Sequence, residues 1–123
     1  MTILIVDDSR IMRNIIKNTL TGHARYANCQ YLEAPDGREA QRLIQSQAID
    51  LLLLDWNMPM LNGLELVKRL RADAVQAKLP IIMITSESAK YSVIEAVKAG
   101  VNDYLIKPVS EKLLMEKLER LGL

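Results

Sequence analysis

Five short hydrophobic runs alternate along the chain with five segments whose apolar residues recur at helical spacing. The runs predict β-strands, because short apolar stretches bounded by polar residues are typical of buried strands. They cover residues 2–6, 28–34, 49–54, 81–84 and 102–106. The four leucines at 51–54 indicate a central strand that is buried on both faces.

The intervening segments predict helices, each preceded by polar residues that can cap its first turn. Ser9, Asp36, Asn62 and Ser110 precede the first, second, third and fifth helices, and the polar loop 85–88 precedes the fourth. Gly22 and Gly100 are placed to end the first and fourth helices. The apolar residues expected on the inner faces are Ile11, Met12, Ile15, Ile16 and Leu20, then Ala40, Leu43 and Ile44, then Leu64, Val67 and Leu70, then Val93, Ile94 and Val97, and finally Leu113, Leu114, Leu118 and Leu121.

Strict alternation of strand and helix predicts an α/β fold. Consecutive parallel strands need right-handed crossover helices, and the resulting sheet is covered by helices on both faces. The chain shows no repeat, low-complexity tract or linker, and its 123 residues are enough to bury one core. We therefore expect a single domain over residues 1–123.

Composition narrows the function without naming it. The 16 basic residues nearly balance the 15 acidic ones, so no field favours nucleic acid. No apolar run approaches the length of a membrane helix, and the first residues lack a basic signal region, so we expect a cytoplasmic monomer. Cys29, the single cysteine, is expected to act as a small buried hydrophobe, and His23, the single histidine, as a solvated loop residue.

The polar residues of greatest interest each come directly after a predicted strand. Asp7 and Asp8 follow the first strand, Asp55 the third, Thr85 the fourth and Lys107 the fifth. The carboxyl ends of parallel strands share one edge of the sheet, so these side chains are expected to converge. Taken singly, each residue could be a helix cap or a turn former, but the combination at four strand ends favours a site.

The chemistry of this set favours phosphoryl transfer. Three carboxylates within about 4 to 6 Å repel by roughly 3 to 4 kcal/mol per pair at an effective dielectric of 20, so a cation is required. Oxygen ligands favour Mg²⁺, and zinc is disfavoured because no cysteine or second histidine lies at ligand spacing from His23. Asp55 is ionised at neutral pH and can act as a nucleophile on phosphorus. The scattered glycines build no loop for a nucleotide.

These motifs also resemble a known family. The pair Asp7-Asp8, the run Asp55-Trp56-Asn57-Met58-Pro59, Thr85 and Lys107-Pro108 are similar, in order and spacing, to the receiver domains of two-component response regulators. The likeness covers essentially the whole chain. It implies a flavodoxin-like, doubly wound (βα)5 fold with a five-stranded parallel sheet of order 2-1-3-4-5 flanked by five helices.

The resemblance implies specific roles at the site. Asp55 would accept a phosphoryl group from a histidine kinase or a small phosphodonor. Asp8, Asp55 and the Asn57 carbonyl would coordinate Mg²⁺, with Asp7 acting through a water. Lys107 would contact the phosphoryl oxygens beside a cis peptide bond to Pro108.

The resemblance also implies a response away from the site. The amides of Asn57 and Ser86 would complete the phosphate cradle, and Thr85 and Tyr104 would move together as a switch. Both fit a two-state element that one added charge biases. The output surface would be formed by the fourth helix, fifth strand and fifth helix, and its candidate contacts are Lys90, Tyr91, Tyr104 and Lys117. Val109 replaces a larger aromatic residue of chemotaxis regulators, which leaves the output partner open.

We therefore expect a signalling protein, not an enzyme, that assists its own phosphorylation and dephosphorylation. Its partners would be a histidine kinase and a downstream protein, either a flagellar motor switch or a phosphotransfer protein. Alternatives within this class are a phosphorelay intermediate and a receiver from a larger hybrid kinase. A metal-dependent phosphatase would need a general acid and a lid, which the chain does not offer, and a pure interaction module would not need the full set of polar residues.

Overall fold

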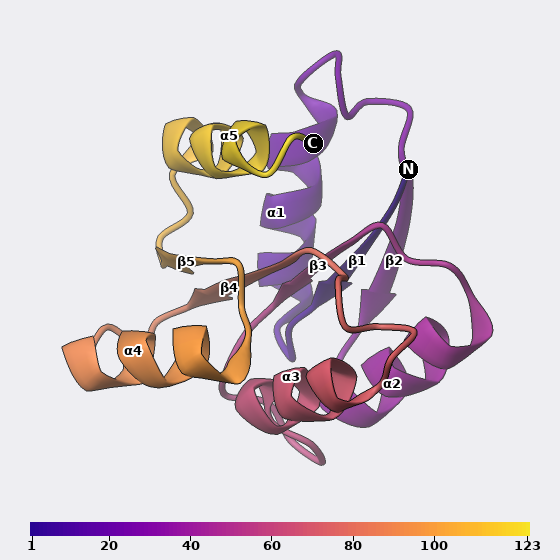
Figure 1. The fold of residues 1–123 in the computed structure, drawn as a ribbon. Helices are drawn as coiled ribbons and strands as arrows, with labels where there is room; N and C mark the ends of the chain where they lie inside the picture. Colours follow the sequence, from indigo (N-terminus) through magenta and orange to yellow (C-terminus); the bar gives the residue numbers. More distant parts are fainter.

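The computed structural model describes residues 1–123 as five parallel strands and five helices in strict alternation (Figure 1). The strands are β1 (Thr2–Val6), β2 (Gln30–Ala34), β3 (Leu51–Leu54), β4 (Ile81–Thr85) and β5 (Asp103–Ile106). The helices are α1 (Arg10–Thr21), α2 (Gly37–Ser46), α3 (Gly63–Ala72), α4 (Lys90–Ala99) and α5 (Glu111–Arg120). The strand order is β2-β1-β3-β4-β5, which confirms the predicted doubly wound fold.

The sheet separates two hydrophobic cores. In Figure 1, α1 and α5 lie on one face of the sheet and α2, α3 and α4 on the other. Successive residues of a strand point to opposite faces, so Leu52 and Leu54 enter the core under α2, α3 and α4, while Leu51 and Leu53 enter the core under α1 and α5. All four leucines are buried, as predicted for a central strand.

Four of the five predicted helix caps are confirmed. The side chain of Ser9 accepts a hydrogen bond from the backbone N–H of Met12. In the same way, the N-cap side chains of three further helices each accept from the backbone N–H three residues later, namely Asp36, Asn62 and Ser110. The fourth helix differs from the prediction, because Ala89 occupies its N-cap position and makes no side-chain capping bond.

The inner faces of three helices are narrower than predicted. On α1 the stripe formed by Met12, Ile16 and Leu20 packs against the sheet, whereas Ile11 is 73% exposed and Ile15 is also exposed. A helix that shares one sheet face with a neighbour contacts the sheet along one row of side chains, and residues a quarter-turn away remain outside. For the same reason the predicted inward positions Ile94, Val97 and Leu113 are exposed.

The boundaries of several strands also differ from the prediction. β2, β3 and β5 begin one or two residues later than expected, and β4 extends to Thr85. The residues at the expected strand starts lie outside the paired register, although the N–H groups of Asp50 and Asn102 still donate to the carbonyls of Thr2 and Ile81 at 2.9 and 2.8 Å. None of the helices has the length and hydrophobicity that a crossing of the membrane requires.

A half-buried cation joins the sheet to α3 and α4 at the edge opposite the predicted site. The guanidinium of Arg71 donates to the carbonyls of Gly100, Gln76 and Leu79 at 2.9, 2.9 and 2.7 Å. It also donates to the side-chain oxygen of Asn102 at 3.1 Å. Burial lowers the pKa of Arg71, which has no acidic partner among these groups. Arg71 therefore holds together the loops that lead into β4 and β5.

Candidate functional site

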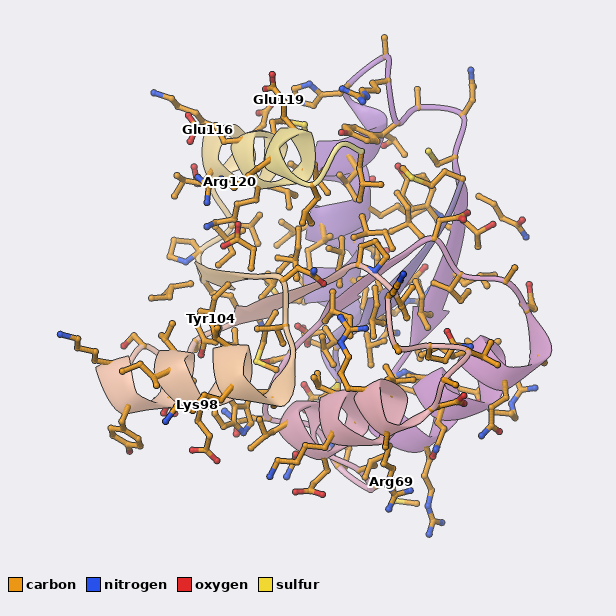
Figure 2. All side chains as sticks on the ribbon, viewed as in Figure 1. Arg69, Lys98, Tyr104, Glu116, Glu119 and Arg120 are labelled. Atoms are coloured by element: carbon orange, nitrogen blue, oxygen red, sulfur yellow. The ribbon has the colours of Figure 1, made fainter.

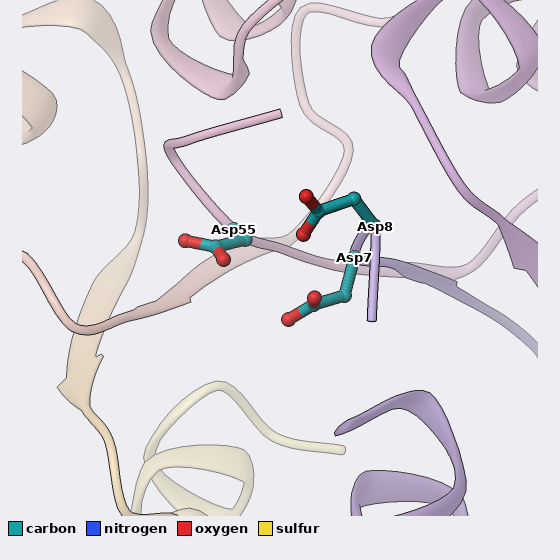
Figure 3. Close-up of side chains that lie close together, drawn as sticks. All are labelled: Asp7, Asp8 and Asp55. Carbon is teal, nitrogen blue, oxygen red and sulfur yellow. The ribbon is translucent and has the colours of Figure 1, made fainter. Parts of the chain in front are cut away.

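The predicted acidic residues meet at the carboxyl ends of β1 and β3. Because β1 and β3 are neighbours in parallel register, Asp7 and Asp8 come next to Asp55 (Figure 3). One carboxylate oxygen from each of the three side chains lies within 4.8 Å of the others. Asp7 is 1% exposed and Asp55 is 7% exposed, whereas Asp8 is open to solvent. These three carboxylates form a group that could hold a metal ion.

Lys107 joins this group from the edge strand β5. Its ammonium donates to Oδ2 of Asp7 at 2.7 Å and to Oδ2 of Asp55 at 2.9 Å. We call the four residues Asp7, Asp8, Asp55 and Lys107 the acidic site. With three carboxylates and one ammonium ionised, its formal charge is −2, which matches a divalent cation.

Backbone groups hold the two buried carboxylates in place. Oδ1 of Asp7 accepts from the N–H of Ser9 at 2.9 Å, and Oδ1 of Asp55 accepts from the N–H of Trp56 at 2.7 Å. Both acids therefore use one oxygen for the backbone and the other for Lys107. This arrangement fixes the side chains before any ligand is present.

Burial and pairing act in opposite directions on the charged groups. Burial raises the pKa of Asp7, although hydrogen bonds from Lys107 and Ser9 oppose the effect. Burial alone would lower the pKa of Lys107, but its hydrogen bonds to Asp7 and Asp55 outweigh that effect and raise the pKa. Lys107 therefore remains a cation at neutral pH.

Arg13 supports the acidic site from α1, and sequence reasoning missed it. Its guanidinium donates to the main-chain carbonyl of Asp7 at 2.7 Å and to the carboxylate of Glu33 at 3.0 Å. Arg13 thus ties the turn after β1 to both α1 and β2. Its position four residues after Ser9 was the only available signal, and an arginine on a helix is usually solvated.

The turn after Asp55 folds back tightly against the strand end. The N–H of Gly63 donates to the carbonyl of Trp56 at 2.8 Å. A Cβ atom at Gly63 would lie 2.1 Å from the carbonyl oxygen of Asp55, so only glycine fits here. Within this turn Met58 is buried, whereas Asn57 is exposed beside the acidic site.

Thr85 and Tyr104 each make a hydrogen bond to the backbone of Glu87. Thr85 is fully buried at the end of β4, and its hydroxyl oxygen accepts from the N–H of Glu87 at 3.3 Å. The phenol of Tyr104 points inward between β5 and α4 and donates to the carbonyl of Glu87 at 2.6 Å (Figure 2). Burial raises the pKa of Tyr104 to about 12, and the charges of Glu87 and Asp55 add to this effect. The predicted switch residues are therefore joined through Glu87, which sequence reasoning did not single out.

The other predicted residues are more dispersed. Ser86 is exposed in the loop after β4, and Lys90 and Tyr91 are exposed at the start of α4. Lys117 differs from a free surface lysine, because its side chain is only 17% exposed and its ammonium donates to Asp103 at 2.8 Å. The peptide bond between Lys107 and Pro108 is cis, as the resemblance implied.

His23 and Cys29 lie away from the acidic site. His23 is less solvated than predicted, because its Nε2 contacts the carboxylate of Glu111 at the start of α5. Cys29 is half-buried rather than fully buried, and it packs against the core under α1 and α5. Neither residue touches the groups at the strand ends.

Comparison with known proteins places this geometry in a family. The model of the response regulator receiver domain matches residues 3–119. A chemotaxis protein CheY homolog from Campylobacter jejuni is 51% identical over 120 residues, covering 97% of this chain and 90% of the relative. Chemotaxis protein CheY1 from Helicobacter pylori is 50% identical over 120 residues, covering 97% of this chain and 94% of the relative.

Solved structures agree with the sequence comparisons. Vibrio cholerae chemotaxis protein CheY4 superposes with a TM-score of 0.85 at 33% identity, covering 97% of this chain and 96% of that one. The receiver domain of Francisella response regulator 1452 has a TM-score of 0.85 at 31% identity, covering 98% of this chain and 94% of that one. The family match, the relatives and the fold all agree, and the chain belongs to the response regulator receiver domain family.

Proposed function

We propose that this receiver domain accepts a phosphoryl group on Asp55 from a histidine kinase and thereby controls the binding of a downstream protein. The observation that carries the proposal is the position of the Lys107 ammonium, which bonds both Asp7 and Asp55 beside the exposed Asp8. The ionised Asp55 carboxylate can attack an incoming phosphoryl group there while the Lys107 ammonium offsets its negative charge. The names of the chemotaxis relatives support a chemotaxis pathway, and we propose a flagellar motor switch or a phosphotransfer protein as the downstream partner.

The covalent step needs little beyond what the acidic site holds. An oxygen of Asp55 forms a bond to phosphorus while the bond between phosphorus and the donor's imidazole nitrogen breaks. The imidazole keeps the electron pair and takes a proton from solvent. Lys107 stabilises negative charge on the phosphoryl oxygens, and the backbone hydrogen bond to Oδ1 keeps the Asp55 carboxylate oriented.

The proposal includes a divalent cation held by Asp7, Asp8 and Asp55, with the carbonyl of Asn57 as a further ligand. The donors are all oxygen atoms, and their formal charge with Lys107 is −2, so the residues fit Mg²⁺. When bound, Mg²⁺ would supply the positive charge that offsets repulsion between the carboxylates and the phosphoryl group. Asp7 lies deepest of the three and would act through a water.

The response would pass from Asp55 to the face formed by α4, β5 and α5. Phosphorylation replaces the single negative charge of the Asp55 carboxylate with a charge of about −2 and adds strong acceptor oxygens. The buried Thr85 hydroxyl and the amides of Asn57 and Ser86 are the donors proposed to meet it. Movement of Thr85 would change the packing of Tyr104 and the surface around Lys90, Tyr91 and Lys117.

The first prediction tests the acceptor directly. With Mg²⁺ and either acetyl phosphate or beryllofluoride, the fluorescence of Trp56 should change, because this residue directly follows Asp55. Asp55→Asn should abolish both the fluorescence change and the mass gain of one phosphoryl group from acetyl phosphate. Glu95→Gln removes one exposed carboxylate from α4 and should leave both signals intact. A wild-type protein without either signal would refute the proposal.

A further inference from the structure

The start of α4 is built differently from the start of every other helix. Four helices are capped by the side chain of their own N-cap residue, but Ala89 has no side chain that can accept a hydrogen bond. The carboxylate of Glu87 instead bonds two other groups at the start of this helix. Its Oε1 accepts from the N–H of Ala89 at 3.3 Å and from the hydroxyl of Ser92 at 3.2 Å. A negative charge at this position also complements the positive end of the helix dipole.

The backbone of Glu87 makes two further hydrogen bonds, both to the proposed switch residues. Its N–H donates to the Thr85 hydroxyl oxygen at 3.3 Å, and its carbonyl accepts from the Tyr104 phenol at 2.6 Å. Thr85, Tyr104 and Ser92 are all buried, so these bonds are shielded from water. One residue thus connects the strand end behind the acidic site to the first turn of α4.

We propose that Glu87 is a positioning residue that couples the state of Thr85 and Tyr104 to the first turn of α4 through its carboxylate cap. The coupling rests on the proposed phosphoryl response, whereas the capping does not. If Thr85 moves toward Asp55, the N–H of Glu87 must follow its acceptor or lose it. Either change shifts the carboxylate relative to Ala89 and Ser92, and the first turn of α4 tightens or frays accordingly.

The capping is tested by amide hydrogen exchange without any phosphodonor. Glu87→Ala should speed exchange at Ala89, Ser92 and Val93 about fivefold, the usual effect of a lost cap. Glu87→Gln keeps an acceptor oxygen and should stay within about twofold of the wild type. Ser92→Ala removes one of the two donors and should give an intermediate rate. Unchanged exchange in Glu87→Ala would overturn the capping.

Glu95→Ala is the matched control, because Glu95 is exposed on the same helix and makes no hydrogen bond to the loop before it. It removes the same charge without removing the cap. Exchange at the first turn should therefore match the wild type. If Glu95→Ala speeds exchange as much as Glu87→Ala does, the effect is one of charge alone and the capping is refuted.

The coupling is tested by adding beryllofluoride and Mg²⁺ to the same proteins. In the wild type and in Glu87→Gln, exchange at the first turn of α4 should change, whereas in Glu87→Ala this change should be lost while the Trp56 response persists. A first-turn change that survives in Glu87→Ala would overturn the coupling. Absence of the Trp56 response in the wild type would instead refute the proposed function, and the exchange rates without beryllofluoride would still decide the capping.

Discussion

Met60 is the one non-glycine residue with a positive φ, at 70°. It lies in the turn between Asp55 and α3, and its side chain is 70% exposed, so packing does not compensate for the backbone conformation. The left-handed region costs most residues roughly 1–2 kcal/mol, but asparagine tolerates it better. The fold accepts this cost in the turn that carries Asn57 past the acidic site.

Met60→Asn should therefore raise the free energy of unfolding by about 0.5–1 kcal/mol. The reason is relief of backbone strain without loss of buried contacts. Urea denaturation followed by Trp56 fluorescence measures the change. Arg69→Asn, which places asparagine at an exposed helical position, serves as the control. A lower free energy of unfolding for Met60→Asn would contradict the prediction.

At the scale of elements, Arg71 carries the connection between α3, α4 and the sheet. Its guanidinium satisfies the carbonyls of Gly100, Gln76 and Leu79, which have no other side-chain donor in this group. Arg71→Leu should lower the free energy of unfolding by about 2–4 kcal/mol, because three partly buried carbonyls lose their side-chain donor. Arg69→Leu, on the exposed side of the same helix, should change it by less than about 0.5 kcal/mol.

Thermal and urea denaturation of the two arginine variants would test this comparison. Because Arg71 lies at the edge opposite the acidic site, Arg71→Leu should still give the Trp56 response to beryllofluoride at a temperature where the variant is folded. Equal free energies of unfolding for Arg71→Leu and Arg69→Leu would show that the hydrogen bonds of Arg71 contribute nothing to stability.

The elements themselves were largely predictable from sequence, because burial and capping leave local signals. The four leucines of β3 and the caps Ser9, Asp36, Asn62 and Ser110 needed no tertiary information. The inner faces of α1 and α4 were not predictable in the same way, since Ile11 and Ile94 have helical spacing but lie beyond the contact stripe. The roles of Arg13 and Glu87 depend on contacts with other elements, which periodicity cannot reveal.

At the scale of the whole molecule, the acidic site lowers the stability of the fold, because it gathers negative charges that a cation can bind. Asp8 adds a third negative charge beside two buried carboxylates that share a single ammonium. Without divalent ions, Asp8→Asn should raise the free energy of unfolding by about 1 kcal/mol, because like-charge repulsion falls. This is the pattern expected where a binding site is built at a cost to the fold.

Mg²⁺ should reverse the order of stability, so that the wild type becomes more stable than Asp8→Asn. At a concentration of about ten times Kd, an ion that binds only the folded state stabilises it by about 1.4 kcal/mol. The wild type should gain this stability and Asp8→Asn should gain much less, as measured by urea denaturation with and without MgCl₂. Sodium chloride at matched ionic strength separates binding from screening, and an equal gain in both proteins would contradict the assignment of Asp8.

Lys107 reaches the acidic site from β5, which is the outermost strand on its side of the sheet. Synthesis proceeds from the amino end, so a nascent chain that has emerged only as far as β4 already contains the three aspartates but not their ammonium partner. An unfinished chain would therefore hold its anions together poorly and respond weakly to a donor. If Asp55 is the phosphoryl acceptor proposed above, the site is complete only once the last strand has docked against β4.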